Sequence, residues 1–386
     1  MHLLIKSNLD LFFFIILIMI YTVVLIISIS FLITFYIIPL AIKFSNKYGI
    51  YDLPNHIKNH HRKISFLGGT AIILGTMIPL ELFIPNTVSK PIYLNALIII
   101  LRLSYLQGLD DDIFNRSAIR KFIIQLILCS LLIYYSDLRL PMGSLFSQIA
   151  HPYFIFIMTV VFAVAIVNSY NLIDGIDGLA ASISLLSCLF FAFVFYLESN
   201  YFFFFMALSL TAALIAFLCY NKPPAHIFMG DSGSLFIGMV LATFTLVFIN
   251  ARSVSLPFTY GNRFIISFSF ISIPFLDMIR LFGFRIYKKS SPFKGDNNHI
   301  HHLMTKIGFT NKQTVFIIIS LMLLNVGIAF LAIDNSFLGF IPINIAIYVL
   351  LIQGLRQLNT FLSKRGFNIS GERISESNSN EQRWTA

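Results

Sequence analysis

The sequence predicts an all-α polytopic membrane protein with about eleven transmembrane helices, an N-terminus outside the cytoplasm and a C-terminus inside it. Three observations predict this class. Hydrophobic residues make up 57% of the 386 residues and charged residues only 11%, and the mean hydropathy of +0.83 is far from that of an ordinary soluble domain. Long apolar segments recur along the whole chain. The basic residues gather in alternate connections between these segments.

Eleven segments meet or approach the roughly 20 apolar residues that a helix needs to cross the hydrocarbon core. They are residues 11–40, 66–84, 92–108, 121–136, 154–170, 179–197, 201–219, 234–250, 262–283, 314–333 and 338–359. The first is about 30 residues long and has no small-residue cleavage site near its end, so we expect a retained helix that tilts or extends past the bilayer. We expect one membrane domain over residues 1–362 and a polar, disordered cytoplasmic tail over residues 363–386.

The basic residues predict how the helices are oriented. The net charge is +10, but Lys and Arg are sorted by connection and form no continuous basic patch, so we expect no nucleic-acid partner. With the N-terminus outside, the cytoplasmic connections would be residues 42–65, 109–120, 171–178, 220–233 and 284–313, plus the tail from residue 360. These hold most of the Lys and Arg, whereas the opposite set holds only Lys6, Lys90, Arg139 and Arg252. The positive-inside rule therefore predicts an outside N-terminus and a cytoplasmic C-terminus.

The segment from Asn168 to Leu179, NSYNLIDGIDGL, places two asparagines and two aspartates at the end of an apolar run. Asp174 and Asp177 are three residues apart and would share one face of a helical turn, with Asn171 extending that face. Such a face suits a divalent cation or a phosphate-bearing ligand. Like the other polar clusters of the chain, it falls on the predicted cytoplasmic side.

Three adjacent carboxylates, Asp110 to Asp112, follow another apolar segment in the sequence GLDDD. They repel one another unless a cation neutralises them. Mg²⁺ is one candidate, because it usually binds through one or two carboxylates plus substrate phosphates. A solvated acidic cap that faces Arg116, Arg120 and Lys121 explains the same residues, and the sequence leaves both interpretations open.

A third cluster lies where the apolar segment around residue 234 begins, in FMGDSGSL, with Gly230 and Gly233 flanking Asp231. Small residues let backbone N–H groups and a carboxylate approach a ligand closely. Helix capping is sufficient to explain Ser232 and Ser234, but it does not explain a carboxylate between glycines next to the membrane. Asp231 is therefore a candidate ligand-binding residue.

The longest cytoplasmic connection contains three histidines after a basic run. The histidines are His299, His301 and His302, and the basic residues are Lys288, Lys289 and Lys294. Imidazoles bind metals, donate hydrogen bonds to phosphate and carry protons near neutral pH. A lone histidine in such a loop is usually incidental, but three within four residues favour contact with an anion or a nucleotide.

Taken in order, GLDDD, NSYNLIDGIDGL, FMGDSGSL and HIHHLM resemble the motifs of the polyprenyl-phosphate N-acetylhexosamine-1-phosphate transferases, from about Asp52 to Phe309. SPF followed by HIHHLM and GFT is most similar to the bacterial undecaprenyl-phosphate N-acetylglucosamine-1-phosphate transferases. Ile300 interrupts the three consecutive histidines that are usual in the peptidoglycan branch, which argues against a muramoyl-pentapeptide substrate. Two further positions depart from the family pattern, because Ile57 and Phe66 stand where arginine is usual.

The resemblance implies transfer of N-acetylglucosamine 1-phosphate from its UDP-sugar to undecaprenyl phosphate, with release of UMP on the cytoplasmic face of the bacterial inner membrane. The product would be the first lipid-linked intermediate of a cell-surface polysaccharide, such as the O antigen of a lipopolysaccharide. Another UDP-N-acetylhexosamine is an alternative donor. A membrane transporter is the rival class, but its carboxylates would lie in mid-helix instead of at helix ends on one side. The oligomeric state stays open, a homodimer included.

The resemblance also implies a Mg²⁺ cofactor, with Mn²⁺ as an alternative, and a role for each motif residue. The expected metal ligands are Asp231, Asp111 and Asp112. The expected catalytic carboxylates are Asp111, Asp112, Asp174 and Asp177. The expected substrate-binding residues are Asn168, Asn171, His299, His301, His302, Lys58 and Arg285. Which carboxylate acts as a base is open, because a lipid monophosphate is already largely ionised at neutral pH.

Overall fold

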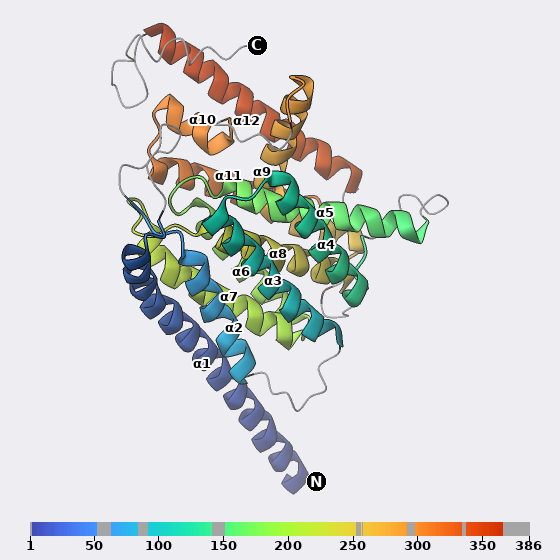
Figure 1. Cartoon of the computed structure of the whole chain (residues 1–386). Helices are drawn as coiled ribbons and strands as arrows, with labels where there is room; N and C mark the ends of the chain where they lie inside the picture. The colour runs from blue at the N-terminus through green and yellow to red at the C-terminus, as the bar shows by residue number, and fades with distance from the viewer. Residues whose placement is uncertain are drawn as a thin grey trace.

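The computed structural model describes residues 2–51, 63–83, 92–140, 151–251, 256, 258–291, 298–333 and 337–365. Over these residues the chain forms twelve α-helices and no β-strand, and one isolated parallel bridge joins Ser65 to Ile227. The helices are α1 (His2–Tyr48), α2 (Gly68–Phe83), α3 (Ile92–Phe114), α4 (Ala118–Ser136), α5 (Pro152–Ile173), α6 (Leu179–Leu197), α7 (Tyr201–Asn221), α8 (Gly230–Asn250), α9 (Tyr260–Tyr287), α10 (Ile300–Ile307), α11 (Asn311–Leu331) and α12 (Phe337–Arg365). They pack as a bundle with α1 along one flank and α12 along the opposite flank (Figure 1).

The predicted all-α polytopic fold is confirmed. Ten of the described helices are long and apolar enough to cross a membrane, and α2 is a shorter apolar helix of 16 residues. Together they correspond to the eleven predicted segments. α1 is longer than predicted, because it begins at His2 and its apolar part runs from Ile16 to Tyr48. α12 continues past residue 362 to Arg365, and the rest of the expected tail, residues 366–386, lies outside the described residues.

One helix, α10, was not among the predicted segments. It has eight residues, too few to cross a membrane, and it directly follows the first histidine of the HIHH motif. Its buried apolar residues, Ile300, Leu303, Met304 and Ile307, follow the spacing i, i+3, i+4 and i+7 and form one face. Gly308 ends the helix with a φ of 109°, which glycine adopts without strain. α10 packs on α11 and α12, so it holds the histidines against the membrane helices.

The central helix of the bundle is α8. Every residue of α8 from Ser232 to Ile249 is buried, and the helix contacts α2, α3, α5, α6 and α9. A helix that is apolar on all sides has no face suited to water, and here other helices of the protein cover it. Anything held at the first turn of α8 is therefore surrounded by several other helices.

Two glycines allow α2 and α3 to approach the first turn of α8. A methyl group at Gly69 of α2 would collide with the backbone of Gly233, and one at Gly108 of α3 would collide with the carbonyl group of Asp231. The backbone N–H of Gly69 also donates to the carbonyl of Met229 at 2.9 Å. Because small residues let helix backbones approach closely within a membrane, motifs from separate helices meet at this end of the bundle.

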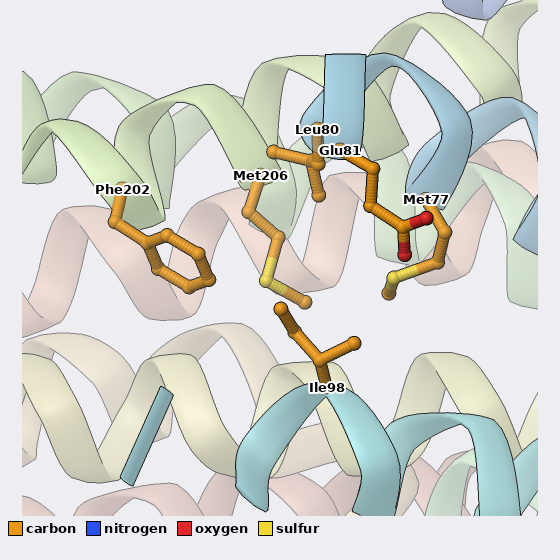
Figure 2. Close-up of a pocket in the computed structure, with 6 residues that line it drawn as sticks. All are labelled: Met77, Leu80, Glu81, Ile98, Phe202 and Met206. Atoms are coloured by element: carbon orange, nitrogen blue, oxygen red, sulfur yellow. The ribbon is translucent and has the colours of Figure 1, made fainter. Parts of the chain in front are cut away.

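A small pocket lies between α2, α3 and α7, away from that end. Its lining residues are Met77, Leu80, Glu81, Ile98, Phe202 and Met206 (Figure 2). Met77 follows Gly69 by eight residues, or about 12 Å along the helix at the usual rise per residue. Glu81 forms an ion pair with Arg102 of α3, which accounts for two charges inside apolar segments. The pocket contains none of the motif residues.

Candidate active site

Side chains from α3, α4, α5 and α8 meet at one end of the bundle. Lys121 Nζ of α4 lies 2.7 Å from Asp111 Oδ2 of α3 and 2.8 Å from Asp231 Oδ2 of α8. Asn171 of α5 donates from Nδ2 to Asp231 Oδ1 at 2.9 Å and to Ser234 Oγ at 2.9 Å. We call Asp111, Lys121, Asn171 and Asp231 the carboxylate cluster. Three motifs that are far apart in sequence thus contact one another directly.

Asp112 fixes the first turn of α8. Its Oδ1 accepts a hydrogen bond from the backbone N–H of Asp231 at 2.8 Å, and its Oδ2 accepts one from the N–H of Ser232 at 2.9 Å. The first N–H groups of a helix lack partners within the helix, and a carboxylate is well suited to them. Gly230, at a φ of 73°, gives this carboxylate room to approach. Asp112 therefore sets the position from which Asp231 points into the cluster.

Asp110 is the member of GLDDD that matches the acidic-cap interpretation. Its two carboxylate oxygens accept from Nη2 and Nε of Arg116, both at 2.9 Å, and Arg120 lies 3.3 Å away. The neighbouring Asp111 instead joins the carboxylate cluster through Oδ2. Because the two side chains point to different partners, both interpretations of the acidic run hold, each for a different residue.

Asp174 is a further carboxyl group near the cluster. It lies directly after α5. Burial and the negative charges of Asp231, Asp112 and Asp177 raise the pKa of Asp174 to about 8. Burial is the largest cause of this shift, and the three neighbouring carboxylates raise the pKa further. A cation bound at this end would oppose the effect of these carboxylates and lower the pKa of Asp174.

Asp177 holds the segment that connects α7 to α8. Its Oδ2 accepts from the backbone N–H of Ala225 at 3.1 Å. The next residue, Gly178, donates from its N–H to Asn221 Oδ1 at 2.9 Å, and the amide of Asn221 donates to the carbonyl of Ile227 at 2.8 Å. The second half of the NSYNLIDGIDGL motif is thus tied to the segment that leads into Asp231.

Asn168 is not in contact with the carboxylate cluster. Its Nδ2 donates to Gln125 Oε1 of α4 at 2.7 Å and to the carbonyl of Val164 at 2.9 Å. It lies almost one turn before Asn171 on α5, and Gln125 lies one turn after Lys121 on α4. The pair therefore fixes the register of the two helices that carry Asn171 and Lys121.

The histidine motif lies against the NSYNLIDGIDGL segment. A methyl group at Gly175 would collide with the ring of His301. His301 is fully buried, and among the described residues neither of its ring nitrogens has a hydrogen-bond partner. Burial and the neighbouring His302 and His299 hold the pKa of His301 well below its usual range. The ring of His302 is 4.2 Å from that of His301, centroid to centroid. These side chains form one group, which we call the histidine cluster.

His299 is held from the other side. Its Nδ1 lies 2.9 Å from Asp277 Oδ2 of α9, and its ring stacks on that of His301 at 5.6 Å. Arg285 is also on α9, buried two turns after Asp277, with its guanidinium 5.9 Å from the ring of Phe282. Lys58 lies outside the described residues.

Two residues of this region were not predicted as functional. Lys121 was considered only as a counter-charge, yet it joins Asp111 to Asp231; its position at the start of an apolar segment, one turn before Gln125, could have marked it. Asp277 lies inside an apolar segment, where a charge is costly and commonly has a function.

The described residues contain no group of three or more His, Cys, Asp or Glu side chains arranged to hold a metal ion. The carboxylate cluster nevertheless suits a hard cation, because Asp111 Oδ2 and Asp231 Oδ2 converge on the single ammonium group of Lys121. A Mg²⁺ ion needs only one or two carboxylates when water and substrate phosphates supply its other ligands. The donor set therefore fits a substrate-assisted Mg²⁺ site.

Comparison with known proteins agrees with this arrangement. The family model described as glycosyl transferase family 4 matches residues 94–249, which include the carboxylate cluster. The probable undecaprenyl-phosphate N-acetylglucosaminyl 1-phosphate transferase of Bacillus subtilis is 30% identical over 295 residues, which is 75% of this chain and 79% of that protein.

Two undecaprenyl-phosphate alpha-N-acetylglucosaminyl 1-phosphate transferases are similar to the same degree. The protein of Thermotoga maritima is 29% identical over 299 residues, or 77% of this chain and 88% of that protein. The protein of Escherichia coli K12 is 29% identical over 313 residues, or 77% of this chain and 81% of that protein. The chain therefore belongs to glycosyl transferase family 4, within the polyprenyl-phosphate N-acetylhexosamine-1-phosphate transferases that its motifs resemble, and it is a membrane-embedded transferase.

Proposed function

We propose that this enzyme transfers N-acetylglucosamine 1-phosphate from UDP-N-acetylglucosamine to undecaprenyl phosphate and releases UMP. The observation that carries the proposal is the direct contact between Asp111, Lys121 and Asp231, supplied by three helices at one end of a membrane bundle. The names of the relatives support the same acceptor and the same sugar phosphate. The enzyme would make the first lipid-linked intermediate of a cell-surface polysaccharide such as O antigen.

The reaction is a phosphoryl transfer. A phosphate oxygen of undecaprenyl phosphate attacks the β-phosphorus of the UDP-sugar. The bond from this phosphorus to the bridging oxygen breaks, and UMP leaves with that oxygen. Such a transfer requires mainly that the reactants are positioned and that their charge is neutralised. An acceptor that is already ionised needs no base, so the carboxylates are required for charge and position.

The residues at this end divide into groups that suit these tasks. The ammonium group of Lys121 would stabilise charge on the diphosphate. The amide of Asn171, held by Asp231 and Ser234, and the carboxylates of Asp174 and Asp177 would line the nucleotide side. His301, fully buried with no described partner, is suited to donate to the sugar phosphate, because a buried polar group is normally satisfied by some ligand.

Asp231 and Asp111 would hold Mg²⁺, or Mn²⁺ in its place, and the ion would neutralise the diphosphate of the donor. Asp112, whose two oxygens accept backbone N–H groups of α8, would act mainly by placing Asp231, and a direct bond from it to the metal stays a prediction. The nearby carboxyl groups Asp231, Asp112 and Asp177, each of which raises the pKa of Asp174, support a cation at this end because a positive charge there would offset their mutual repulsion.

We further propose that the site faces the cytoplasm of a bacterium, at the inner membrane, where UDP-sugars are made available. The positive-inside distribution of Lys and Arg supports this orientation. In this proposal the polyprenyl chain would lie in the lipid beside the helices, and its phosphate would reach the helix ends. The site would then join a water-soluble donor to a membrane acceptor.

The direct test is a transfer assay. Membranes that contain the protein are incubated with undecaprenyl phosphate, Mg²⁺ and radiolabelled UDP-N-acetylglucosamine. We expect label in the organic-extractable lipid, release of UMP, and loss of transfer when Mg²⁺ is chelated or UMP is added in excess. Transfer from a different UDP-N-acetylhexosamine only would change the sugar and keep the reaction. The absence of transfer from every UDP-N-acetylhexosamine would contradict the proposal and favour the transporter alternative.

Asp231→Asn provides the matched variant for this assay. The amide keeps the shape of the side chain and removes its charge, so we expect turnover to be lost while the protein remains in the membrane. Asp137→Asn is the control, because Asp137 follows α4 at the other end of the bundle and its side chain is 89% exposed. Full activity of Asp231→Asn would remove this residue from the proposed metal site.

A further inference from the structure

A single buried carboxylate joins α9, α10 and α12 beside the histidine cluster. Asp277 Oδ2 lies 2.9 Å from His299 Nδ1, and Asp277 Oδ1 accepts from the hydroxyl of Tyr348 at 2.6 Å. Arg280 Nη2 donates to Oδ1 at 2.8 Å. The backbone N–H of Ile300 is 3.3 Å from both oxygens. Asp277 thus receives donors from three helices, although it lies within an apolar segment.

The ion pair with Arg280 does not explain this arrangement. Arg280 is three residues after Asp277 on the same helix, and such a pair could form without any contact to α10 or α12. A buried ion pair is also weak evidence of a stabilising role, because apolar residues of similar volume often serve stability as well. The carboxylate of Asp277 also holds the Nδ1 atom of His299 in the histidine motif. This contact calls for a functional explanation.

We propose that Asp277 is a positioning residue that fixes the ring orientation and the tautomer of His299, and that Tyr348 of α12 and Arg280 hold Asp277 in place for this purpose. The proposal rests on the proposed function, because it assigns His299 to the sugar-phosphate end of that site. It adds a helix, α12, that the motifs do not include.

The hydrogen-bond chemistry determines the tautomer. An ionised carboxylate only accepts hydrogen bonds, so the proton of the His299 ring must be on Nδ1, where Asp277 accepts it. The other nitrogen, Nε2, makes no hydrogen bond to any part of the chain that the structure describes. This nitrogen is then available to a substrate oxygen, as donor when the ring is protonated or as acceptor when it is neutral. A carboxylate behind a histidine has the same orienting effect at metal and hydrolase sites.

The two oxygens of Asp277 have separate partners, which keeps the carboxylate from rotating. The Tyr348 hydroxyl and Arg280 share Oδ1, while His299 has Oδ2. Arg280 Nη2 also donates to the carbonyl of Asn298, at 2.5 Å. The residue before His299 and the His299 ring are therefore both fixed from α9. Tyr348 adds a contact from α12, so the position of α12 affects the histidine.

Three variants test this chain of contacts by transfer kinetics. Asp277→Asn removes the charge that fixes Nδ1–H, and we expect kcat to fall about 10- to 100-fold with little change in the KM for the UDP-sugar. Tyr348→Phe removes only the hydroxyl, and we expect a smaller fall in kcat. In the Asp277→Asn background, Tyr348→Phe should have no further effect, because the hydroxyl acts through Asp277.

The control is Asn344→Leu. Asn344 is buried one turn before Tyr348 on α12, and its amide donates only within its own helix, to the carbonyl of Phe340. We expect this variant to keep the kcat of the native protein even if its thermal stability changes. Wild-type kcat for Asp277→Asn would overturn the proposal. Multiplicative losses in the double variant, or an equal loss for Asn344→Leu, would also overturn it, since they would indicate general damage to α12 packing.

A spectroscopic measurement separates this proposal from the proposed function. In protein labelled with ¹⁵N-histidine in lipid vesicles, the His299 signal, assigned by its loss in His299→Gln, should show a protonated Nδ1. Asp277→Asn should shift this signal, and Asn344→Leu should not. The shift together with failed transfer by the native protein would reject the proposed reaction alone. An unprotonated Nδ1 in the native protein, or no shift in Asp277→Asn, would reject the positioning role whatever the transfer assay shows.

Discussion

At the scale of single residues, Lys121 is the cation between the two carboxylates proposed to hold Mg²⁺. Its ammonium group lies 2.7 Å from Asp111 and 2.8 Å from Asp231. Lys121→Met removes this charge and leaves two carboxylates facing each other, which raises their attraction for a divalent cation. We expect the dissociation constant for Mn²⁺ to fall about 3- to 30-fold, because one charge a few ångströms from another is worth a few kcal/mol at most. The measurement is electron paramagnetic resonance of Mn²⁺ with purified protein.

The neighbouring ion pair provides the control for Lys121→Met. Arg120 is the preceding residue on α4 and lies 3.3 Å from Asp110, with its side chain 48% exposed. An exposed pair of this kind contributes little, so Arg120→Met should leave the Mn²⁺ affinity unchanged. Weaker or equal Mn²⁺ binding by Lys121→Met would show that the lysine does not stand at the metal position.

His301 should make the protein less stable in mild acid. Its pKa in the folded protein is well below the usual range because the ring is buried beside His302 and His299, whereas in the unfolded chain it is about 6.5. Between the two values the unfolded chain binds the extra proton, so the stability present above pH 6.5 declines as pH falls, by at most about 1.4 kcal/mol per pH unit. Tm measured in detergent between pH 7.5 and 5.0 should fall more steeply for the native protein than for His301→Gln. His226→Gln, at an exposed position, is the control, and equal slopes for all three proteins would contradict the prediction.

At the scale of helices, the site depends on how closely α3 approaches α8. A methyl group at Gly108 would collide with the carbonyl of Asp231, so Gly108→Ala must push the first turn of α8 away from Asp111 and Lys121. Displacements of about 1 Å commonly cost about 100-fold in rate, and overpacking costs about 1–3 kcal/mol of stability. We expect at least a 10-fold loss of transfer.

Gly283→Ala is the helical control for this prediction. Gly283 is on α9 with no atom near the position of an added methyl group, and alanine favours a helix by about 1 kcal/mol over glycine. This variant should keep full activity and equal or greater thermal stability. Full activity of Gly108→Ala would mean that α8 tolerates a shift and that the contact is not needed to place Asp231.

The helices themselves could be predicted from the sequence because their apolar lengths are set by the thickness of the bilayer. α10 could not, since eight amphipathic residues fall below that length. Within the site, the sequence predicted which segments meet but not the partner of each side chain. The three adjacent aspartates of GLDDD are chemically identical, yet each has a different partner. Asp110 binds Arg116, Asp111 binds Lys121, and Asp112 binds the backbone of α8. The direction in which each side chain leaves the end of α3 determines its partner, and this direction depends on how the helices pack.

Two further residues show that motif membership does not predict contact with the site: Asn168 lies in a motif and is not in contact with the carboxylate cluster, and Asp277 lies outside the motifs and contacts the histidine motif. Asn168 belongs to a chemical motif but contacts Gln125 in the interior of the bundle, because it lies almost one turn deeper than Asn171. Asp277 belongs to no motif and contacts His299, which is 22 residues later. Sequence periodicity predicts contacts along one helix. It does not predict a contact between two helices when the path of the connection between them is unknown.

At the scale of the whole molecule, the described side chains to which we assign the reaction lie at one end of the bundle. The carboxylate cluster and the histidine cluster lie where α3, α5 and α9 end and where α4, α8 and α10 begin. The same end holds Lys121, Arg285 and Lys288, whereas at the opposite end Arg263 is buried in an ion pair with Glu198 at 2.6 Å. A site that combines a nucleotide donor with a lipid acceptor must lie on the side where the nucleotide is present, so orientation is part of the proposed function.

This orientation can be measured with two matched tyrosines. Tyr153 at the start of α5 is 75% exposed, and Tyr287 at the end of α9 is 83% exposed, so they mark opposite ends of the bundle. In a background with Cys129, Cys188 and Cys219 replaced, a membrane-impermeant maleimide should label Tyr153→Cys on intact spheroplasts. It should label Tyr287→Cys only after the membrane is permeabilised. The reverse pattern would place the carboxylate cluster on the outer face, away from UDP-sugars, and would contradict both the predicted topology and the proposed donor.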